Sequence, residues 1–550
     1  MGSELMEDHM KYTRLNPVVP LNIHIGVTGH RKNINEELIS EKTRYILKKL
    51  DNYLNCKLCK TPYYFTVISP LAEGADCIVA DEVLKWKKSV KKEKNRLDVI
   101  LPLPEQEYIK DFTTKESRNK FYRLIAHSNS KKTLKNCKSR EEAYEYTGHY
   151  TVNNCDFLIA IWNGKPAVGK GGTAEIIDYA KRTNKHLFWI NSITGKITEN
   201  VTWDNLGDIL KYTDIYNKET LKSSNIKNNL YQNYKSLKNE LNDSKIPSSV
   251  LDSLYTNLLL NFTRADMLAD KYQSFYISSY RILYILAASA ALTVSVQHLL
   301  YKGIPQISWL QVAVTSAIII LLLMSNVKDF HRRWIDYRFL SETLRSSIFF
   351  SIMGKKSKIT EPMPYSKPSN YNNWAVKTCT WICDRQLQLG AKTDIPLEKL
   401  KNLVLNAWIN DQINFYTERS HEHLKKHKIF SLAGTMLFAT TFITAVCYSI
   451  YVTVFSTLNP LISNLIAIIG IIAPFTAAII GIDVYREHLR NSRRYQNMVP
   501  YLHGIRDEIV KAEDINTLID LLDKANEVML AEHQDWQAIL SFHDIKPPRI

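Results

Sequence analysis

The sequence predicts a Rossmann-like α/β domain with a parallel sheet, followed by an all-α membrane region with four transmembrane helices in two hairpins. Two observations support this prediction. The first part of the 550-residue chain alternates short β-rich runs with helical stretches, and small residues follow the runs. That pattern is typical of a parallel sheet that binds its ligand at the carboxyl ends of the strands. The last part contains long charge-free stretches, and about 20 apolar residues suffice to cross a bilayer.

Five strands are expected in the N-terminal domain, at 23–27, 64–68, 97–101, 157–162 and 186–190. The first ends in Gly26-Val-Thr28-Gly29-His30-Arg31 and precedes a helix at 36–54. The fourth runs into a glycine-rich loop at 163–172, and a second helix follows it. Small residues let the backbone approach a ligand closely, and a helix that begins there offers free N–H groups to a phosphate. We therefore expect an anion-binding cleft where these loops meet, with the run Thr147-Gly148-His149-Tyr150 near it.

Four membrane spans are expected, at 282–300, 307–326, 429–455 and 461–482. Short turns join the members of each pair, and these turns carry few cations. Lys and Arg are frequent before, between and after the pairs, so the positive-inside rule places both chain ends in the cytosol. A helix precedes and follows each hairpin, which indicates an internal duplication.

The resulting domain plan has six parts. It comprises a lead (1–20), an α/β domain (21–198), a helical and charged connector (199–260), a first two-helix module (261–354), a linker (355–395) and a second module (396–550).

The first module carries the motif Trp334-Ile-Asp336-Tyr337-Arg338-Phe-Leu-Ser-Glu342-Thr-Leu-Arg345 after its hairpin. This motif resembles the W-x-D-Y-R-x-L-A-E-x-L-R signature of SLATT domains, bacterial two-transmembrane modules commonly fused to sensors of nucleotide signals. The second module departs from the signature and keeps only the position of Tyr495 and the helical layout.

The N-terminal motifs GVTGHR, LAEGAD, IAIW and GKGGTAE, in this order over about 21–195, resemble the SLOG superfamily of Rossmann-like domains. Its members include cytokinin-releasing phosphoribohydrolases, DNA-processing protein A, the N-terminal regions of TRPM channels and nucleotide sensors of antiphage systems. The resemblance implies that the loop around residue 172 cradles phosphate, that Arg31 pairs with an anionic group, and that Glu73 and Asp76 hold ribose hydroxyls. The implied ligand-binding residues are Gly26, Thr28, Gly29, His30, Arg31, Ser69, Glu73, Gly74, Asp76, Trp162, Gly169, Gly171, Gly172, Thr173 and Glu175.

Four of these residues have alternative interpretations. His30 and Arg31 are otherwise solvent-facing residues at the start of a helix. In the phosphoribohydrolases a Glu after the glycine-rich loop stabilises an oxocarbenium-like sugar, which makes Glu175 the candidate catalytic residue. Here the loop lacks the Pro-Gly-Gly of those enzymes, so a ligand sensor is favoured over an enzyme, and Glu175 is otherwise a first-turn residue favoured by the helix dipole. Trp162 is either a packed strand end or a platform for a base.

Composition narrows the remaining possibilities. The net charge of +16 is concentrated beside the apolar segments, and no recognised nucleic-acid motif accompanies it, so direct nucleic-acid binding is not expected. The eight cysteines include Cys56 and Cys59 but no second pair at a convincing spacing, which predicts free thiols and no metal site.

These features together predict a membrane effector that senses a nucleotide signal. The expected ligand is NAD- or ADP-ribose-like or a cyclic nucleotide. Its binding triggers oligomerisation and pore formation or membrane disruption in bacterial defence. The expected partners are the inner-membrane bilayer, further copies of the chain and a signal-producing enzyme. The alternatives are a membrane-anchored nucleotide N-glycosidase and a non-enzymatic membrane scaffold.

Overall fold

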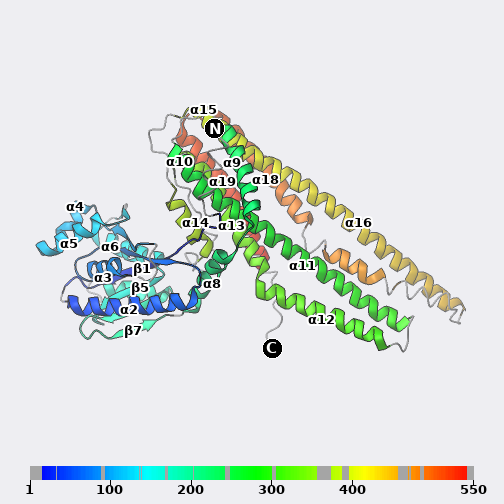
Figure 1. The fold of residues 1–550 in the computed structure, drawn as a ribbon, viewed down its shortest axis with the longest axis horizontal. Helices are drawn as coiled ribbons and strands as arrows, with labels where there is room; N and C mark the ends of the chain where they lie inside the picture. The colour runs from blue at the N-terminus through cyan, green and yellow to red at the C-terminus, as the bar shows by residue number, and fades with distance from the viewer. Residues whose placement is uncertain are drawn as a thin grey trace. The chain divides into compact units, whose positions relative to one another are not determined.

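The structure, a computed structural model, describes residues 15–32, 34–87, 93–134, 137, 139–166, 171–201, 203–241, 248–299, 305–355, 373–386, 395–455, 469, 472–482 and 488–541. The chain divides into two compact units (Figure 1). The first, here called the sheet unit, comprises Met1–Ser223 and Glu361–Arg385. The second, the helical unit, comprises Ser224–Thr360 and Gln386–Ile550.

A seven-stranded sheet forms the centre of the sheet unit, in the order β4-β3-β2-β1-β5-β6-β7. Its strands are β1 (Leu21–Gly29), β2 (Tyr63–Ser69), β3 (Arg96–Leu101), β4 (Ser130–Thr133), β5 (Phe157–Trp162), β6 (His186–Asn191) and β7 (Ile197–Asn200). The five predicted strands are present. The expectation of a purely parallel sheet is wrong at one edge, because β7 pairs antiparallel with β6. Strands β4 and β7 were not predicted because they are short, polar and exposed, with little of the apolar signal that marks a buried strand.

The order of the strands reverses beside β1. The chain builds outward from β1 through β2, β3 and β4, and then returns to place β5 on the other side of β1. In an open α/β sheet, this reversal leaves a crevice outside the carboxyl ends of the two strands where a ligand binds. The strand order therefore places the expected crevice at the carboxyl ends of β1 and β5.

Helices connect the strands of the sheet unit. They are α2 (Glu36–Lys57), α3 (Ala75–Lys85), α4 (Glu105–Tyr108), the 3-10 helix η1 (Ile109–Asp111), α5 (Lys115–Ala126), α6 (Arg140–Asn154), α7 (Thr173–Arg182), α8 (Asp204–Lys218) and α14 (Trp374–Asp384). Apolar residues of α6, α7, β5 and β6 share one core cluster that includes Val152, Leu158, Ile176 and Leu187. The core therefore fixes the start of α7 at the carboxyl end of β5.

Helix α14 is an unexpected member of the sheet unit. It lies within the stretch 355–395, which was predicted to be a linker between the two membrane modules. Its residues Trp374, Ala375, Cys379 and Ile382 are buried, and the helix packs against α8 and β1. The segment is short and flanked by polar residues, so its burial could not be recognised from hydrophobic periodicity alone.

The helical unit consists of long helices in two series. The first series is α9 (Ser223–Leu241), α10 (Ser248–Ser253), the π-helix η2 (Leu254–Leu259), α11 (Leu260–Leu299), α12 (Pro305–Lys328) and α13 (Phe330–Ile352). The second is α15 (Leu397–Val404), the π-helix η4 (Leu405–Ile409), α16 (Asn410–Phe455), α18 (His488–Lys511) and α19 (Ile515–Ser541). Each long apolar helix, α11 and α16, directly continues a π-helix. Because π-helices are rare, this shared feature supports the predicted duplication.

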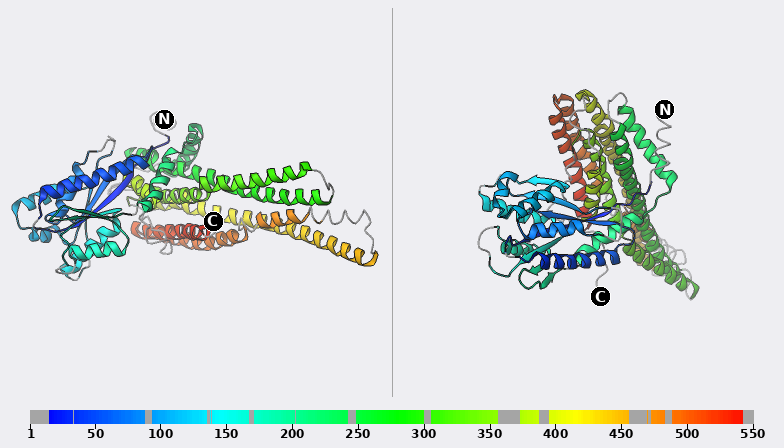
Figure 2. Two further views of the ribbon diagram at one scale, coloured as in Figure 1. Left: turned by 90° about the horizontal axis from the view of Figure 1, so that it is seen from below. Right: turned by 60° about the vertical axis from the view of Figure 1, so that its left-hand side comes forward.

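Three helices of the helical unit are long and apolar enough to cross a membrane. They lie within Ser249–Val294, Trp309–Ile352 and Leu397–Tyr451, and a shorter apolar helix spans Ile472–Ile482. Figures 1 and 2 show α11 and α12 side by side, as expected for the first hairpin. The fourth expected span, 461–482, falls largely outside the described residues, so the second hairpin stays a prediction.

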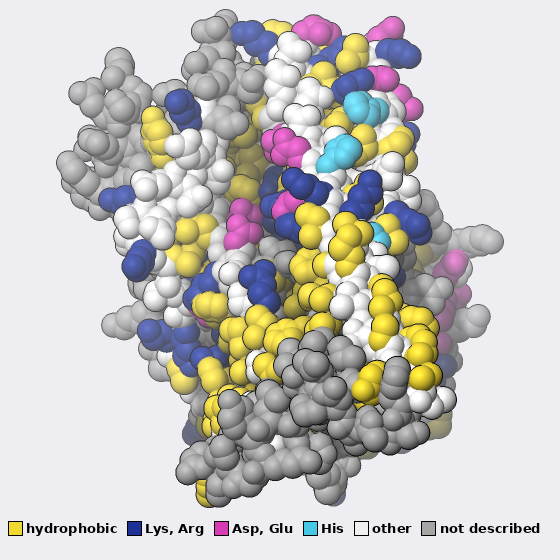
Figure 3. All heavy atoms as spheres, turned by 90° about the vertical axis from the view of Figure 1, so that its right-hand side faces the viewer, with side chains coloured by type: hydrophobic (Ala, Val, Ile, Leu, Met, Phe, Trp, Pro, Cys, Tyr) yellow, Lys and Arg dark blue, Asp and Glu magenta, His cyan; other side chains and the backbone are white. Residues whose placement is uncertain are grey.

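Exposed apolar side chains cover these helices, and cations lie at their borders. Ile282, Val327 and Ile429 are 47%, 78% and 56% exposed, and each adjoins a Lys or Arg in the sequence. In Figure 3 the apolar side chains gather over one part of the helical unit, and Lys and Arg gather beside them. A surface of this kind is stable in a bilayer and not in water.

The motif at 334–345 forms the interface between α13 and α11. Trp334 and Tyr337 pack their rings against Tyr276 and Tyr272, with ring centroids 5.5 Å apart in both pairs. Arg338 lies 3.3 Å from Asp266 of α11 and 2.7 Å from Glu342. These residues therefore hold the helix that follows the first hairpin against the helix that leads into it.

Candidate functional site

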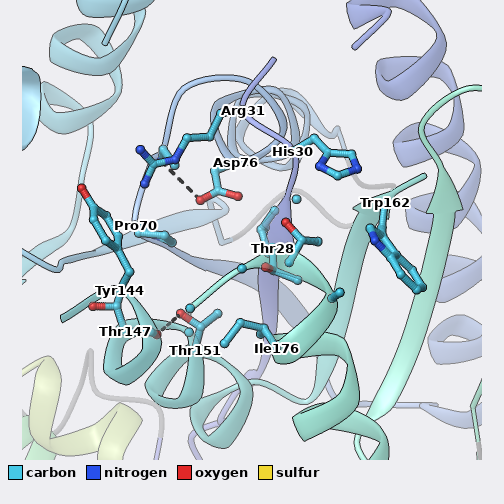
Figure 4. Close-up of a pocket in the computed structure, with 18 of the residues that line it drawn as sticks. Thr28, His30, Arg31, Pro70, Asp76, Tyr144, Thr147, Thr151, Trp162 and Ile176 are labelled. Atoms are coloured by element: carbon cyan, nitrogen blue, oxygen red, sulfur yellow. Dashed lines mark hydrogen bonds between the residues drawn. The ribbon is translucent and has the colours of Figure 1, made fainter. Parts of the chain in front are cut away.

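A cavity of about 450 Å³ lies at the point where the strand order reverses. Residues from the ends of β1, β2 and β5 and from α3, α6 and α7 surround it (Figure 4). Its lining consists of Val27, Thr28, Gly29, His30, Arg31, Pro70, Ala72, Asp76, Tyr108, Tyr144, Thr147, Gly148, Thr151, Trp162, Lys165, Pro166, Gly171, Gly172, Thr173, Ala174 and Ile176. The volume lies within the usual range for small-molecule sites.

The N-terminus of α7 forms one wall of the cavity. Gly172 is its N-cap residue and, being glycine, supplies no side chain to cap the first-turn N–H groups. Gly171 has φ +74°, and a Cβ there would lie 2.7 Å from the backbone N of Glu145, so this position requires glycine. The N–H groups of the first turn and the helix dipole together favour an anion at this wall.

Glu175 stabilises this loop from within α7. Its Oε2 accepts a hydrogen bond of 2.7 Å from the backbone N–H of Gly171, and the residue does not line the cavity. The carboxylate is therefore directed at the loop that precedes its own helix. This geometry favours the first-turn interpretation of Glu175 over a catalytic one.

Arg31 supplies a cation on the opposite side. Its guanidinium lies 4.7 Å from the centre of the Tyr144 ring, and its Nη1 lies 3.7 Å from Asp111 Oδ2. Asp111 is also bonded by Tyr144 and by Arg140, whose Nη2 is 2.5 Å away. Two arginines thus share one carboxylate, and Arg31 and Lys165 are the Lys and Arg residues that line the cavity among the described residues.

Asp76 is a buried carboxyl group that faces the cavity beside Arg31 (Figure 4). It is only 3% exposed, and burial raises its pKa to about 7, although the charge of Arg31 acts in the opposite direction. Among the described residues, the backbone N–H of Ala72 donates to its Oδ2 at 3.3 Å. A buried carboxylate with so little compensation is unfavourable for folding and is typical of a functional site.

His30 and Trp162 lie across the cavity from Arg31. His30 Nε2 accepts a hydrogen bond from the backbone N–H of Asn163 at 3.1 Å, which leaves the proton of a neutral imidazole on Nδ1. Trp162 donates its indole N–H to Lys165 O at 2.7 Å, and its ring packs 5.1 Å from Trp189. Trp162 is therefore both a packed strand end and part of the cavity wall.

Nine of the residues predicted to bind ligand line the cavity: Thr28, Gly29, His30, Arg31, Asp76, Trp162, Gly171, Gly172 and Thr173. Gly169 lies outside the described residues. The structure places Gly26, Ser69, Glu73, Gly74 and Glu175 elsewhere, in positions that shape the surrounding loops.

The contacts of those residues explain their positions. The Cβ that Gly26 lacks would meet Cys155 Sγ at 2.8 Å, and Ser69 Oγ accepts from the N–H of Leu71 at 2.9 Å. Glu73 accepts from Thr113 N–H and Oγ1, the latter at 2.8 Å, so its carboxylate is directed at the residues that precede α5. Gly74 has φ +90°, and a Cβ there would lie 2.5 Å from Arg31 O.

Helix α6 supplies residues that sequence reasoning identified only in part. Tyr144, Thr147, Gly148 and Thr151 fall on one face of this helix and line the cavity, whereas the predicted neighbour His149 does not. The spacing of three and four residues was available in the sequence as a signal. It was weak because α6 carries no continuous apolar stripe.

The site contains groups for binding an anion but no evident metal centre. Within the described part of the chain, no group of three or more His, Cys, Asp or Glu could hold a metal ion.

The family described as "Protein of unknown function (DUF4231)" matches residues 264–350, which run from α11 to α13 and include the motif at 334–345. No curated protein matches the chain.

Proposed function

We propose that the chain is a membrane effector that senses a nucleotide signal through the cavity of the sheet unit. One observation carries the proposal: at the reversal point of the sheet, the open N-terminus of α7 faces a cavity that also contains Arg31 and the aromatic wall of Trp162. Cation, helix N-terminus and aromatic surface together suit a molecule with phosphate and a base.

Binding without hydrolysis is the favoured activity. An N-glycosidase needs a carboxylate at the sugar, and the candidate Glu175 instead accepts a hydrogen bond from Gly171. The expected ligand is NAD- or ADP-ribose-like or a cyclic nucleotide, in keeping with the resemblance of the N-terminal motifs to SLOG domains.

The membrane helices provide the output in this proposal. The resemblance to SLATT modules at 334–345 suggests a bacterial defence effector of the inner membrane with both ends in the cytosol. The apolar parts of the described spans, 282–299, 309–326 and 429–451, contain no charged residue, so several copies would assemble to form a pore or disrupt the bilayer. A separate enzyme would produce the signal.

The first test uses the full chain in detergent micelles. A panel of NAD, ADP-ribose and cyclic nucleotides is titrated calorimetrically, and each mixture is then analysed for hydrolysis products. Dye leakage from liposomes that contain the chain is measured with each compound that binds. The matched variant is Gly172→Phe, whose side chain would occupy the phosphate wall.

Three outcomes are informative. Binding and leakage without products, both lost in Gly172→Phe, support the sensor. Products in catalytic yield would replace it with the N-glycosidase. Absence of binding to every compound would overturn nucleotide sensing and leave a membrane scaffold.

A further inference from the structure

Helix α14 packs against the sheet unit at the end opposite the cavity. It contacts β1 near the amino end of that strand, whereas the cavity lies at the carboxyl end. The Trp374 ring is buried and packs 5.4 Å from the buried ring of Tyr216 on α8. The side chains of Ala375, Cys379 and Ile382 complete a fully buried face.

A buried ion pair fastens this helix to two strands. Lys377 Nζ lies 2.7 Å from Asp156 Oδ2, which directly precedes β5, and donates to Asn22 O of β1 at 3.2 Å. It also lies 3.3 Å from His24 Nδ1, and the backbone N–H of His24 donates to Asp156 at 2.7 Å. The Lys377 and Asp156 side chains are 7% and 3% exposed.

The same two strands run to the cavity. β1 ends in the residues that lead to His30 and Arg31, and β5 ends at Trp162. They are paired from Ile25 with Phe157 to Gly29 with Ile161. Because a strand is stiff along its length, we expect that a displacement of its carboxyl end also displaces its amino end.

The position of α14 in the sequence links its packing to the membrane helices. In the helical unit, the first series of helices ends at Ile352 and the second begins at Leu397, so α14 lies between the two series in the sequence. We propose that α14 is the contact through which the sheet unit controls the membrane modules, with Lys377 as the residue that couples it to β1 and β5. This inference rests on the proposed function, because it assumes a nucleotide-dependent membrane response.

The test compares leakage with and without ADP-ribose, or with whichever panel compound the unmodified chain binds, in liposomes that contain the full chain. In Lys377→Met the ratio of the two leakage rates is expected to fall to about one, while calorimetric binding of the same compound stays within about twofold. Arg385→Gln is the matched control, because Arg385 is an exposed residue that adjoins α14 and pairs with Glu93 at 2.9 Å. It is expected to retain the response.

A second variant separates loss of coupling from loss of folding. Lys377→Met combined with Asp156→Asn removes both charges and leaves an amide that still accepts from His24 N–H. This double variant is expected to fold and bind but to remain unresponsive. Amide hydrogen exchange adds a readout that needs no membrane assay: nucleotide is expected to change the protection of 374–384 in the unmodified chain.

Two results would overturn the inference alone. One is a nucleotide response in Lys377→Met equal to that of the unmodified chain, and the other is unchanged protection of α14 at saturating nucleotide. Failure of the unmodified chain to bind any panel compound is a different result, since it overturns the proposed function itself.

Discussion

A buried aspartate lies at each end of the central strands, Asp76 at the cavity beyond their carboxyl ends and Asp156 just before the start of β5, and the two carboxyl groups are in opposite electrostatic states. Asp76 and Asp156 are 3% and 4% exposed. Burial raises the pKa of Asp76 to about 7. Burial would also raise the pKa of Asp156, but the charge of Lys377 and the bonds from His24 outweigh it and hold that pKa well below its usual range.

The difference separates a carboxylate that is paired within the fold from one that faces a cavity without a cation at hydrogen-bond distance among the described residues. Asp156 has a cation at 2.7 Å that belongs to a distant helix, so its charge holds the fold together. Asp76 has no such partner among the described residues and faces a cavity. Burial alone therefore does not identify a functional acid; the compensation around it does.

The largest effect is expected from breaking the structural pair. Lys377→Met leaves the Asp156 carboxylate buried without its cation, which should destabilise the sheet unit by about 3–5 kcal/mol. Thermal unfolding of the full chain, followed by tryptophan fluorescence, measures the loss. Because the pKa of Asp156 is lowered by folding, this stability is present above the unfolded pKa near 3.8 and is lost as the pH falls below it. Melting that is unchanged at pH 7 would contradict the prediction.

Asp76→Asn is expected to raise the stability of the protein, which is the opposite of the change expected for Lys377→Met. The folded carboxyl binds its proton more tightly than the unfolded one, so its contribution to stability falls as the pH rises from about 4 to about 7. Removing the charge should therefore stabilise the protein at pH 8 by on the order of 2–4 kcal/mol, with little effect near pH 4. Melting curves at both pH values test this. Glu73→Gln is the control. Because Glu73 is hydrogen-bonded to Thr113, the protein should be no more stable after this substitution.

Arg31→Gln sharpens the comparison at the cavity edge. The variant removes the cation beside Asp76 and the partner of an anionic ligand, so nucleotide affinity should fall about ten- to hundredfold. Stability should change little, since the contact with Asp111 is 3.7 Å long and partly exposed. Calorimetric titration measures the affinity. Equal affinity would remove Arg31 from the site.

The smallest effect is expected for Glu175→Gln. The amide oxygen can still accept from Gly171 N–H, so stability should change by less than about 1 kcal/mol and affinity by less than about twofold. Titration and product analysis on the same sample check both. A loss of nucleotide turnover in this variant would instead establish Glu175 as catalytic.

Apolar patterning accounts for the parts of the fold that were predicted. The runs that became β1, β2, β3, β5 and β6 are buried, and their sequences show it. The polar strands β4 and β7 carry no such signal. The long helices were predicted from charge-free length alone, because a bilayer demands little else of a sequence.

The site was predictable where local sequence determines backbone shape. The loop after β1 and the glycine-rich loop before α7 both reach the cavity. Glu73 and Glu175 do not line the cavity and bond Thr113 and Gly171, and motif position does not reveal which neighbour a carboxylate bonds. Tyr144 and Lys377 depend on packing between distant segments, which a single sequence does not display.

The docking of α14 also bears on the order of synthesis. The sheet unit is assembled from 1–223 and 361–385, so its last helix leaves the ribosome after α11, α12 and α13 have been made. The sheet unit therefore lacks the cation that pairs with Asp156 while the first membrane hairpin is already available for insertion. Completion of the sheet unit thus follows synthesis of the first membrane module, so a chain that stalls before residue 377 would be left with an unfinished sheet unit.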